Sequence, residues 1–228
     1  MLINLFMAED KKLALVALLL SIPTVLIALT FHEVAHGYIA YKLGDPTARS
    51  LGRLTLNPLK HIDPIGFIMF LLLGVGYAKP VPINSRYFKK PRRDMALVGA
   101  AGPLANLIMA FIFVILLKLA TLLYTVLPAT APAFIFESYP FVFLILDTGV
   151  TYCLAFTFFN LIPIPPLDGS RILYAFLPSK ALFWVQRHEK YFFWGLLGIF
   201  LICSIFDISI VGIPVNLVKL LLYNLLRI

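Results

Sequence analysis

Long apolar stretches are the feature that most limits what this chain can fold into. The stretches at 13–42, 95–117 and 141–162 are dominated by hydrophobic side chains, and each is long enough to cross a hydrocarbon core of ~30 Å as a helix. Two shorter apolar stretches, 191–206 and 208–226, predict a closing pair of helices. Only 13% of the residues are charged, too few to cover a soluble globule. We therefore predict an all-α polytopic membrane protein with about five transmembrane helices.

The basic residues predict the orientation of these helices. The 42–94 segment carries ten Lys or Arg residues and the 170–190 segment carries four, whereas 128–138 carries none. Short basic loops face the cytoplasm in most membrane proteins, so both basic segments are expected on that side of the cell membrane and the N-terminus outside. The net charge of +8 is thereby explained by topology, and no nucleic acid is expected as a partner.

The connection after the first span is predicted to be unusual. The apolar stretch 65–77 is too short to cross the bilayer upright, which favours a re-entrant or interfacial segment. Alternating prolines in 79–84 exclude a helix and favour extended chain, so we expect a β-hairpin-like element here. The whole chain, 1–228, is predicted to be one integral-membrane domain with a core at 13–175 and a helical hairpin at 191–228.

The first span contains the sequence HEVAH at 32–36. On a helix, positions four apart lie on one face, so His32 and His36 can present two imidazoles to one metal ion. Glu33 then lies beside the metal, where its carboxylate could take a proton from a metal-bound water. Ionisable groups inside a membrane span indicate function by default. The alternative is a helix end with two histidines near the lipid headgroups.

A catalytic zinc site needs a third protein ligand from elsewhere in the chain. Asp168 follows an uncharged run and three prolines on the predicted cytoplasmic side. The prolines interrupt the helix and leave carbonyl groups unpaired, which is tolerated at membrane depth only against protein or a water-filled cavity. The alternative for Asp168 is an N-cap of a helix starting at Ser170. Asp63 and His61 are the other candidates for the third ligand. One Zn²⁺ per chain with two neutral imidazoles, one aspartate and one hydroxide sums to zero charge, which suits a low-dielectric site.

Two asparagines in apolar helices are further candidates. Asn160 and Asn106 lie near the expected depth of the metal and could bind substrate backbone or an oxyanion. Hydrogen bonding between helices is the alternative role for both residues.

Three motifs together resemble the site-2 proteases, which are intramembrane zinc metalloproteases. They are HEVAH in the first span, GPLAN at 102–106 and NLIPIPPLDG at 160–169, and the resemblance covers roughly residues 20–175. The resemblance implies zinc ligation by His32, His36 and Asp168, catalysis by Glu33, and an Asn160 close to the substrate.

The resemblance also extends to the segment 79–84, which looks like the family's membrane-associated β-element and would pair with an unwound substrate by strand addition. PDZ and CBS domains of better-known members have no counterpart here, so the chain resembles the compact branch.

The function expected from these features is zinc-dependent hydrolysis of peptide bonds in single-span membrane proteins near the cytoplasmic face. A CaaX-type membrane protease would need a glutamate ligand in another span, and no glutamate besides Glu33 lies in a predicted span. The non-enzymatic alternative is a metal-binding scaffold or transporter, which would place acids or histidines along a path at the midplane. Only Asp147 is offered for such a path, and the sequence makes no prediction of oligomeric state.

Overall fold

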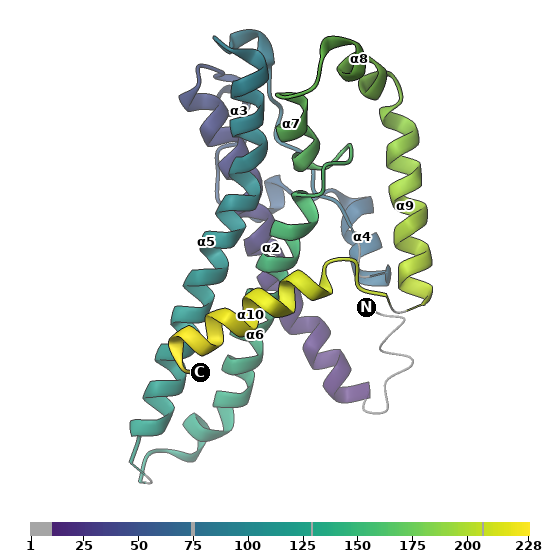
Figure 1. Ribbon diagram of the computed structural model, residues 1–228. Helices are drawn as coiled ribbons and strands as arrows, with labels where there is room; N and C mark the ends of the chain where they lie inside the picture. Colours follow the sequence, from purple (N-terminus) through teal and green to yellow (C-terminus); the bar gives the residue numbers. More distant parts are fainter. Residues whose placement is uncertain (1–10, 74–75, 129, 207) are drawn as a thin grey trace.

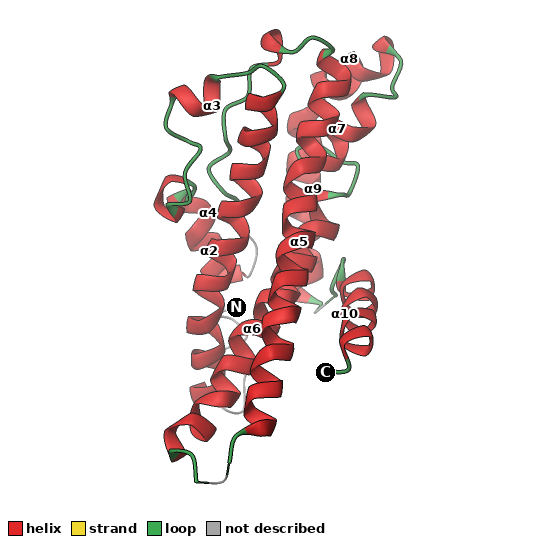
Figure 2. Cartoon of the chain, turned by 90° about the vertical axis from the view of Figure 1, so that its left-hand side faces the viewer, coloured by secondary structure: helices red, strands yellow, loops and turns green. Residues whose placement is uncertain are grey.

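The computed structural model describes residues 11–73, 76–128, 130–206 and 208–228. Helices joined by loops make up these ranges, with no extended sheet (Figures 1 and 2). The helices are α2 (Lys11–Lys42), α3 (Thr47–Ser50), η1 (Pro58–Lys60), α4 (Pro64–Leu73), η2 (Ser85–Tyr87), α5 (Pro91–Val126), α6 (Ala133–Asn160), α7 (Asp168–Tyr174), α8 (Ser179–Arg187), α9 (Glu189–Ile205) and α10 (Gly212–Leu226).

The frame of the molecule is a bundle of α2, α5 and α6, which pack against one another in every pairing. Among the described residues, three helices are long and apolar enough to span a membrane: Leu18–Lys42, Pro91–Val126 and Ala133–Asn160. The three strong predicted spans are thus confirmed as candidate membrane helices. Each of the three carries an internal proline without ending there.

The apolar core lies where these three helices meet. Small side chains allow close approach, since Ala28 of α2 and Ala110 of α5 are completely buried. Val114 and Leu154 fill the space between α5 and α6. Val215 and Leu222 of α10 join the same cluster, so the last helix is part of the core.

The two C-terminal helices differ from the predicted hairpin of two spans. α9 and α10 have 17 and 15 residues, and neither reaches the length of the three long helices. α10 packs obliquely across α6 and α5, while α9 stands upright on the other side of α6 (Figure 1). The predicted total of about five spans is therefore not confirmed by the described residues.

α10 is fixed to α6 by a polar cluster. Lys219 Nζ lies 2.7 Å from Asp147 Oδ1 and donates to Thr151 Oγ1 over 3.0 Å. The hydroxyl of Tyr223 also donates to Asp147. Asp147 thus has a cation and a hydroxyl as partners near the middle of α6.

The segment after the first span is partly helical and partly extended. The apolar stretch predicted to be re-entrant forms α4, a helix of ten residues. Asp63 caps it, since its Oδ1 accepts from the amides of Ile65 and Gly66, each over 3.0 Å. In the extended part, one isolated antiparallel bridge joins Ile62 to Ala78. A β-hairpin is not confirmed, and this bridge is the only β-pairing in the described residues.

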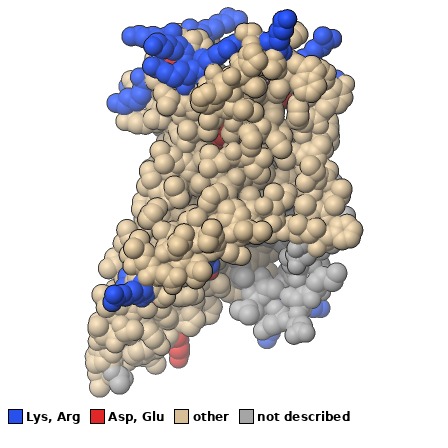
Figure 3. All heavy atoms as spheres, in the orientation of Figure 1, with Lys and Arg blue, Asp and Glu red and all other residues tan. Residues whose placement is uncertain are grey.

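The charges are concentrated at one end of the bundle. In Figure 3 Lys and Arg side chains gather at the end formed by α3, the start of α5, and α8, with an almost uncharged belt below them. The two basic segments of the sequence therefore lie on the same side of the apolar belt, as their common topology requires.

Candidate metal centre

Three side chains from α2 and α7 converge at the basic end of the bundle. Nε2 of His32 and Nε2 of His36 each lie 3.0 Å from Oδ2 of Asp168, and 3.0 Å from each other. The two histidines lie one helical turn apart on the same face of α2, as their spacing predicts. Within the described part of the chain, these three form the one cluster of such side chains that could hold a metal ion.

Asp168 does not act as a helix cap. It is the first residue of α7, and Leu167 occupies the capping position without a side-chain hydrogen bond. Its carboxylate is directed towards the two imidazoles, with Arg171 one turn further along α7 at 3.8 Å from Oδ1. Burial acts against the charged form, but hydrogen bonds to His32 and His36 outweigh it and hold the pKa of the Asp168 carboxyl well below its usual range.

The turn before Asp168 is held tightly against the end of α6. A Cβ atom at Gly169 would lie 2.3 Å from the carbonyl oxygen of Leu161 and 2.6 Å from that of Ile162. No side chain larger than hydrogen fits at this contact. The glycine after Asp168 therefore lets α7 start where its first carboxylate reaches α2.

α5 holds the outer nitrogen atoms of both imidazoles. Nδ1 of His36 lies 2.7 Å from the carbonyl oxygen of Val98, to which it donates. With Nδ1 donating to this carbonyl oxygen, Nε2 is the nitrogen left for a metal ion, which would replace the proton that Nε2 shares with Asp168. His36 is therefore presented as a neutral metal ligand.

Asn106 performs the same task for His32. The side-chain nitrogen Nδ2 of Asn106 lies 3.0 Å from Nδ1 of His32, while the side-chain oxygen Oδ1 is buried without a partner. Oxygen and nitrogen of an amide exchange places by a half-turn, which brings Oδ1 to the Nδ1–H of His32 and satisfies both groups. In that arrangement Nε2 of His32 is also a free ligand atom.

The space around the ligand atoms is kept open by the backbone of α5. A Cβ atom at Gly102 would lie 2.4 Å from Nε2 of His36 and 2.7 Å from Nε2 of His32. Two neutral imidazoles and one carboxylate match the donor set of a catalytic zinc site, which keeps a fourth position for water or substrate. The residues present therefore fit a zinc ion.

Glu33 borders the same cavity of about 360 Å³ as the three ligand candidates. Its side chain is buried, and its Oε2 accepts a hydrogen bond of 2.8 Å from the backbone amide of Val81 in the extended segment. Since Pro80 and Pro82 have no amide hydrogen, Val81 supplies the one donor of this short stretch. The second carboxylate oxygen is left for a reacting water.

The two predicted asparagines lie in different places. Asn160 lines the cavity, and its Nδ2 donates to the carbonyl oxygen of Phe156 over 3.0 Å. Its expected role near the substrate stays a prediction. Asn106 is completely buried behind His32 and is not among the residues that line the cavity. This position favours orienting His32 over the expected contact with substrate.

The other candidates for a third ligand lie elsewhere. The carboxylate of Asp63 caps α4, and Nε2 of His61 donates to the carbonyl oxygen of Thr55 over 2.8 Å. Neither side chain joins the cluster of His32, His36 and Asp168. Among the candidates for a third ligand, the structure therefore favours Asp168 over Asp63 and His61.

Comparison with known proteins agrees with this arrangement. The sequence profile described as Peptidase family M50 matches residues 20–147, more than half of the chain. The putative zinc metalloprotease YwhC of Bacillus subtilis is 42% identical over 177 residues, which are 78% of each chain. The chain belongs to peptidase family M50, the site-2 proteases.

More distant relatives in family M50 carry similar names. The putative zinc metalloprotease Rip2 of Mycobacterium tuberculosis H37Rv is 32% identical over 156 residues, or 63% of this chain and 52% of Rip2. The putative zinc metalloprotease MJ0611 of Methanocaldococcus jannaschii is 26% identical over 168 residues, or 74% and 76% of the two chains. No solved structure gave a significant match. Zinc is the cofactor that both the family and the donor set indicate.

Sequence reasoning missed several residues around the M50 site. Val81, Gly102 and Arg171 contact the reactive groups, yet none of them was a candidate. Arg171 could have been found from its position one turn after Asp168 on a helix. Val81 acts through its backbone amide, which no residue type marks, whereas Gly102 opens the GPLAN motif and could have been found as a glycine at a close helix contact.

Proposed function

We propose that this chain is a zinc-dependent intramembrane endopeptidase that cuts single-span membrane proteins near the cytoplasmic face. The observation that carries the proposal is the placement of Glu33 beside the His32–His36–Asp168 cluster, in one cavity between candidate membrane helices. A metal-binding scaffold would need the three ligands but no buried carboxylate beside them. Membership of family M50 and relatives named as zinc metalloproteases support the same activity.

His32, His36 and Asp168 would hold the zinc ion. When bound, zinc lowers the pKa of water towards ~7 and polarises a carbonyl group. The Glu33 carboxylate accepts one proton of the attacking water, whose oxygen forms the new bond to the carbonyl carbon. Glu33 then gives this proton to the amide nitrogen as the carbon–nitrogen bond breaks. The immediate products are a carboxylic acid and an amine, the acid passes its proton to the amine to give carboxylate and ammonium, and Glu33 returns to its starting charge.

The extended segment offers limited means for strand addition. The amides of Lys79, Val81 and Asn84 are already bound, to His61 O, Glu33 and Asp45 respectively. Of the positions between them, Pro80 and Pro82 provide no donor, and only Ile83 has an amide hydrogen. A substrate strand would therefore pair mainly with carbonyl oxygens of this segment, donating its own amides. Such pairing would hold the substrate unwound next to Glu33.

The first experiment is to measure zinc per chain in detergent-purified wild type, His36→Ala and Asp168→Ala. We expect close to one zinc in wild type and a loss or clear weakening in both variants. Wild type and Glu33→Gln are then compared in vesicles with tagged single-span membrane proteins. Cleavage by wild type alone supports the endopeptidase. Zinc binding without any difference between wild type and Glu33→Gln would favour a scaffold.

The cytoplasmic location of the site rests on the basic end of the bundle. Single cysteines at Ser179 and Ala131 report the two sides, since these residues begin α8 and precede α6. In a chain with Cys153 and Cys203 replaced by serine, an impermeant thiol reagent applied outside intact cells should label Ala131→Cys alone. Labelling of Ser179→Cys alone would invert the topology.

A further inference from the structure

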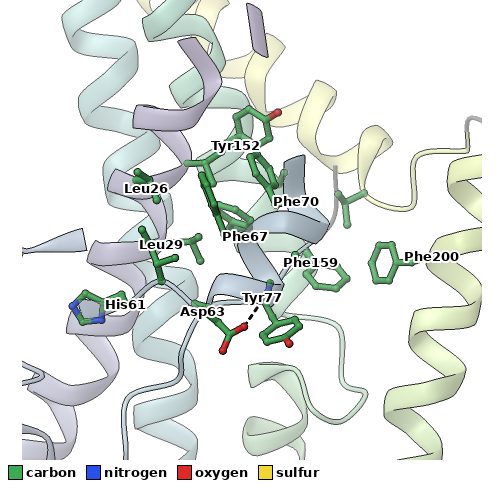
Figure 4. A pocket seen from close by; sticks show the side chains of 18 residues that line it. Leu26, Leu29, His61, Asp63, Phe67, Phe70, Tyr77, Tyr152, Phe159 and Phe200 are labelled. Atoms are coloured by element: carbon green, nitrogen blue, oxygen red, sulfur yellow. Dashed lines mark hydrogen bonds between the residues drawn. The ribbon is translucent and has the colours of Figure 1, made fainter. Parts of the chain in front are cut away.

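A second cavity lies next to the metal centre, between α2, α4, α6 and α9 (Figure 4). Its volume is about 180 Å³. Several aromatic side chains from α4, α6, α9 and the segment after α4 line it, among them Phe67, Phe70, Tyr77, Tyr152, Phe159 and Phe200. The metal site described above does not include these residues, apart from two at the shared boundary.

The rings are arranged edge to face across the helices. Phe70 of α4 and Tyr152 of α6 have centroids 6.1 Å apart with planes at 67°. Phe159 of α6 and Phe200 of α9 have centroids 4.9 Å apart with planes at 68°. A further aromatic ring in this cavity could pack edge to face against these rings, which is a preferred geometry for aromatic pairs.

The cavity opens towards the reacting groups. Leu29, Tyr77, Ala78 and Phe159 line both this cavity and the one that holds Glu33. Leu29 lies four residues before Glu33 on α2, which places the shared boundary of the two cavities about 6 Å further along the helix. An extended peptide covers ~3.3 Å per residue, so this offset corresponds to one or two residues from the hydrolysed bond.

The size selects one kind of occupant. An engineered apolar cavity of ~150 Å³ in a protein interior binds one benzene molecule. A cavity of about 180 Å³ therefore has room for one phenyl ring. Its nearest carboxylate, Asp63, is already bound to the first amides of α4, so the wall presents mainly carbon.

We propose that this aromatic cavity is a specificity pocket that receives one phenylalanine side chain of the substrate within two residues of the hydrolysed bond. The proposal rests on the proposed endopeptidase function and names the substrate feature that the site selects. An enzyme pocket can bind a substrate side chain next to the hydrolysed bond. Substrates whose side chain fits the pocket then have a better stabilised transition state and a higher kcat/KM.

The test compares substrates that differ at one position. A single-span model peptide with alanine throughout its cleavage region is made in versions that place one phenylalanine at each successive position. We expect at least tenfold higher kcat/KM for one position within two residues of the cut. In Ala155→Phe, whose new ring fills the cavity from α6, this ratio should fall to about one. Ala133→Phe, at the exposed start of the same helix, is the matched control and should keep the ratio.

A second variant covers the case in which Ala155→Phe fails to fold. Phe67→Ala widens the cavity, and the preferred residue should then shift from phenylalanine to tryptophan. Zinc content checks folding in each variant. Equal phenylalanine preference in wild type, Ala155→Phe and Phe67→Ala would overturn the proposal while leaving the endopeptidase intact.

A binding measurement separates failure of the pocket from failure of the enzyme. Glu33→Gln is mixed with the same peptide carrying azidophenylalanine, a photoreactive side chain with a single ring, at the preferred position, or at each position in turn if no cleavage is seen. Photo-crosslinks to α4 or α6 residues of the cavity, lost in Ala155→Phe, support the pocket even if nothing is cleaved. Crosslinks elsewhere at every position, or crosslinks from a photoreactive acyl lipid that the peptide does not displace, would show that the cavity holds lipid.

Discussion

The backbone amide of Val81 donates a hydrogen bond of 2.8 Å to Oε2 of Glu33. The extended segment thereby fixes the orientation of the carboxylate that the proposed reaction uses. Pro80 and Pro82 hold this segment extended, and Val81, which precedes a proline, is itself restricted to extended backbone. A backbone contact of this kind can be tested because proline at position 81 removes the donor with little other change.

We predict that Val81→Pro lowers kcat and retains zinc. A hydrogen bond to a charged group contributes about 1.5–3 kcal/mol, which corresponds to roughly ten- to hundredfold in kcat if Glu33 depends on it. Val81→Ala is the control, because it shortens the side chain and keeps the amide. Equal kcat in the two variants at equal zinc content would show that Val81 does not position Glu33.

Asn106→Ala should weaken zinc binding. Nδ1 of His32 would lose its buried partner, and removal of such an outer partner typically reduces metal affinity by about 10–100-fold. Competition with a zinc chelator measures the affinity. Asn106→Asp, which keeps an acceptor, should retain more affinity than Asn106→Ala, and Asn160→Ala should leave it unchanged. If Asn106→Ala bound zinc like wild type, its role would have to be sought in substrate binding.

Gly102→Ala should remove the metal site without disturbing the helix. The added methyl would lie 2.4 Å from Nε2 of His36, so the imidazole must move away from the cluster. Alanine otherwise favours a helix by about 1 kcal/mol relative to glycine. Gly195→Ala in α9 meets nothing within 4 Å and is the control, which should keep full zinc content. Retention of zinc by Gly102→Ala would mean that the bundle can shift at this point.

Lys219→Met should destabilise the packing of α10 on α6. The half-buried carboxylate of Asp147 would lose its cation, and we expect a loss of about 1–2 kcal/mol, less than the range for fully buried pairs. Unfolding in mixed detergent micelles measures the difference. The double variant Asp147→Asn with Lys219→Met should be more stable than Lys219→Met alone. Additive losses would show that the two side chains do not interact.

Much of the helical frame could be predicted from the sequence because apolar length is a local property. The strong stretches became α2, α5 and α6, and the histidine spacing placed two imidazoles on one face of α2. Asp168 could be singled out because an acid after three prolines at membrane depth has few structural reasons to be there. Asp168 lies 132 residues from His36 along the chain, so it was predictable from its residue type and its surroundings in the sequence, and not from nearness to the histidines in the sequence.

Other parts depended on contacts that no local pattern records. The extended segment has the composition of a strand, but its prolines have no amide donors, and the amides of Val81 and Asn84 bind side-chain carboxylates instead of a neighbouring strand. Only one β-bridge therefore forms in the described residues. Asn106 was expected at the substrate, yet its position on α5 relative to His32 is set by helix rotation within the bundle. α9 and α10 have the hydropathy of spans and are shorter than the three long helices. The angle of α10 to the bundle follows from its packing against α6 and α5.

The ion pair between Lys219 and Asp147 can form only after α10 has been synthesised. The two residues are 72 positions apart, so the carboxylate of α6 leaves the ribosome long before its cation exists. Until α10 arrives, α6 carries an unmatched charge that disfavours its settled place among the other helices. The arrival of α10 would thus neutralise α6 during assembly, and chains that stop before Gly212 should be degraded faster in pulse-chase experiments.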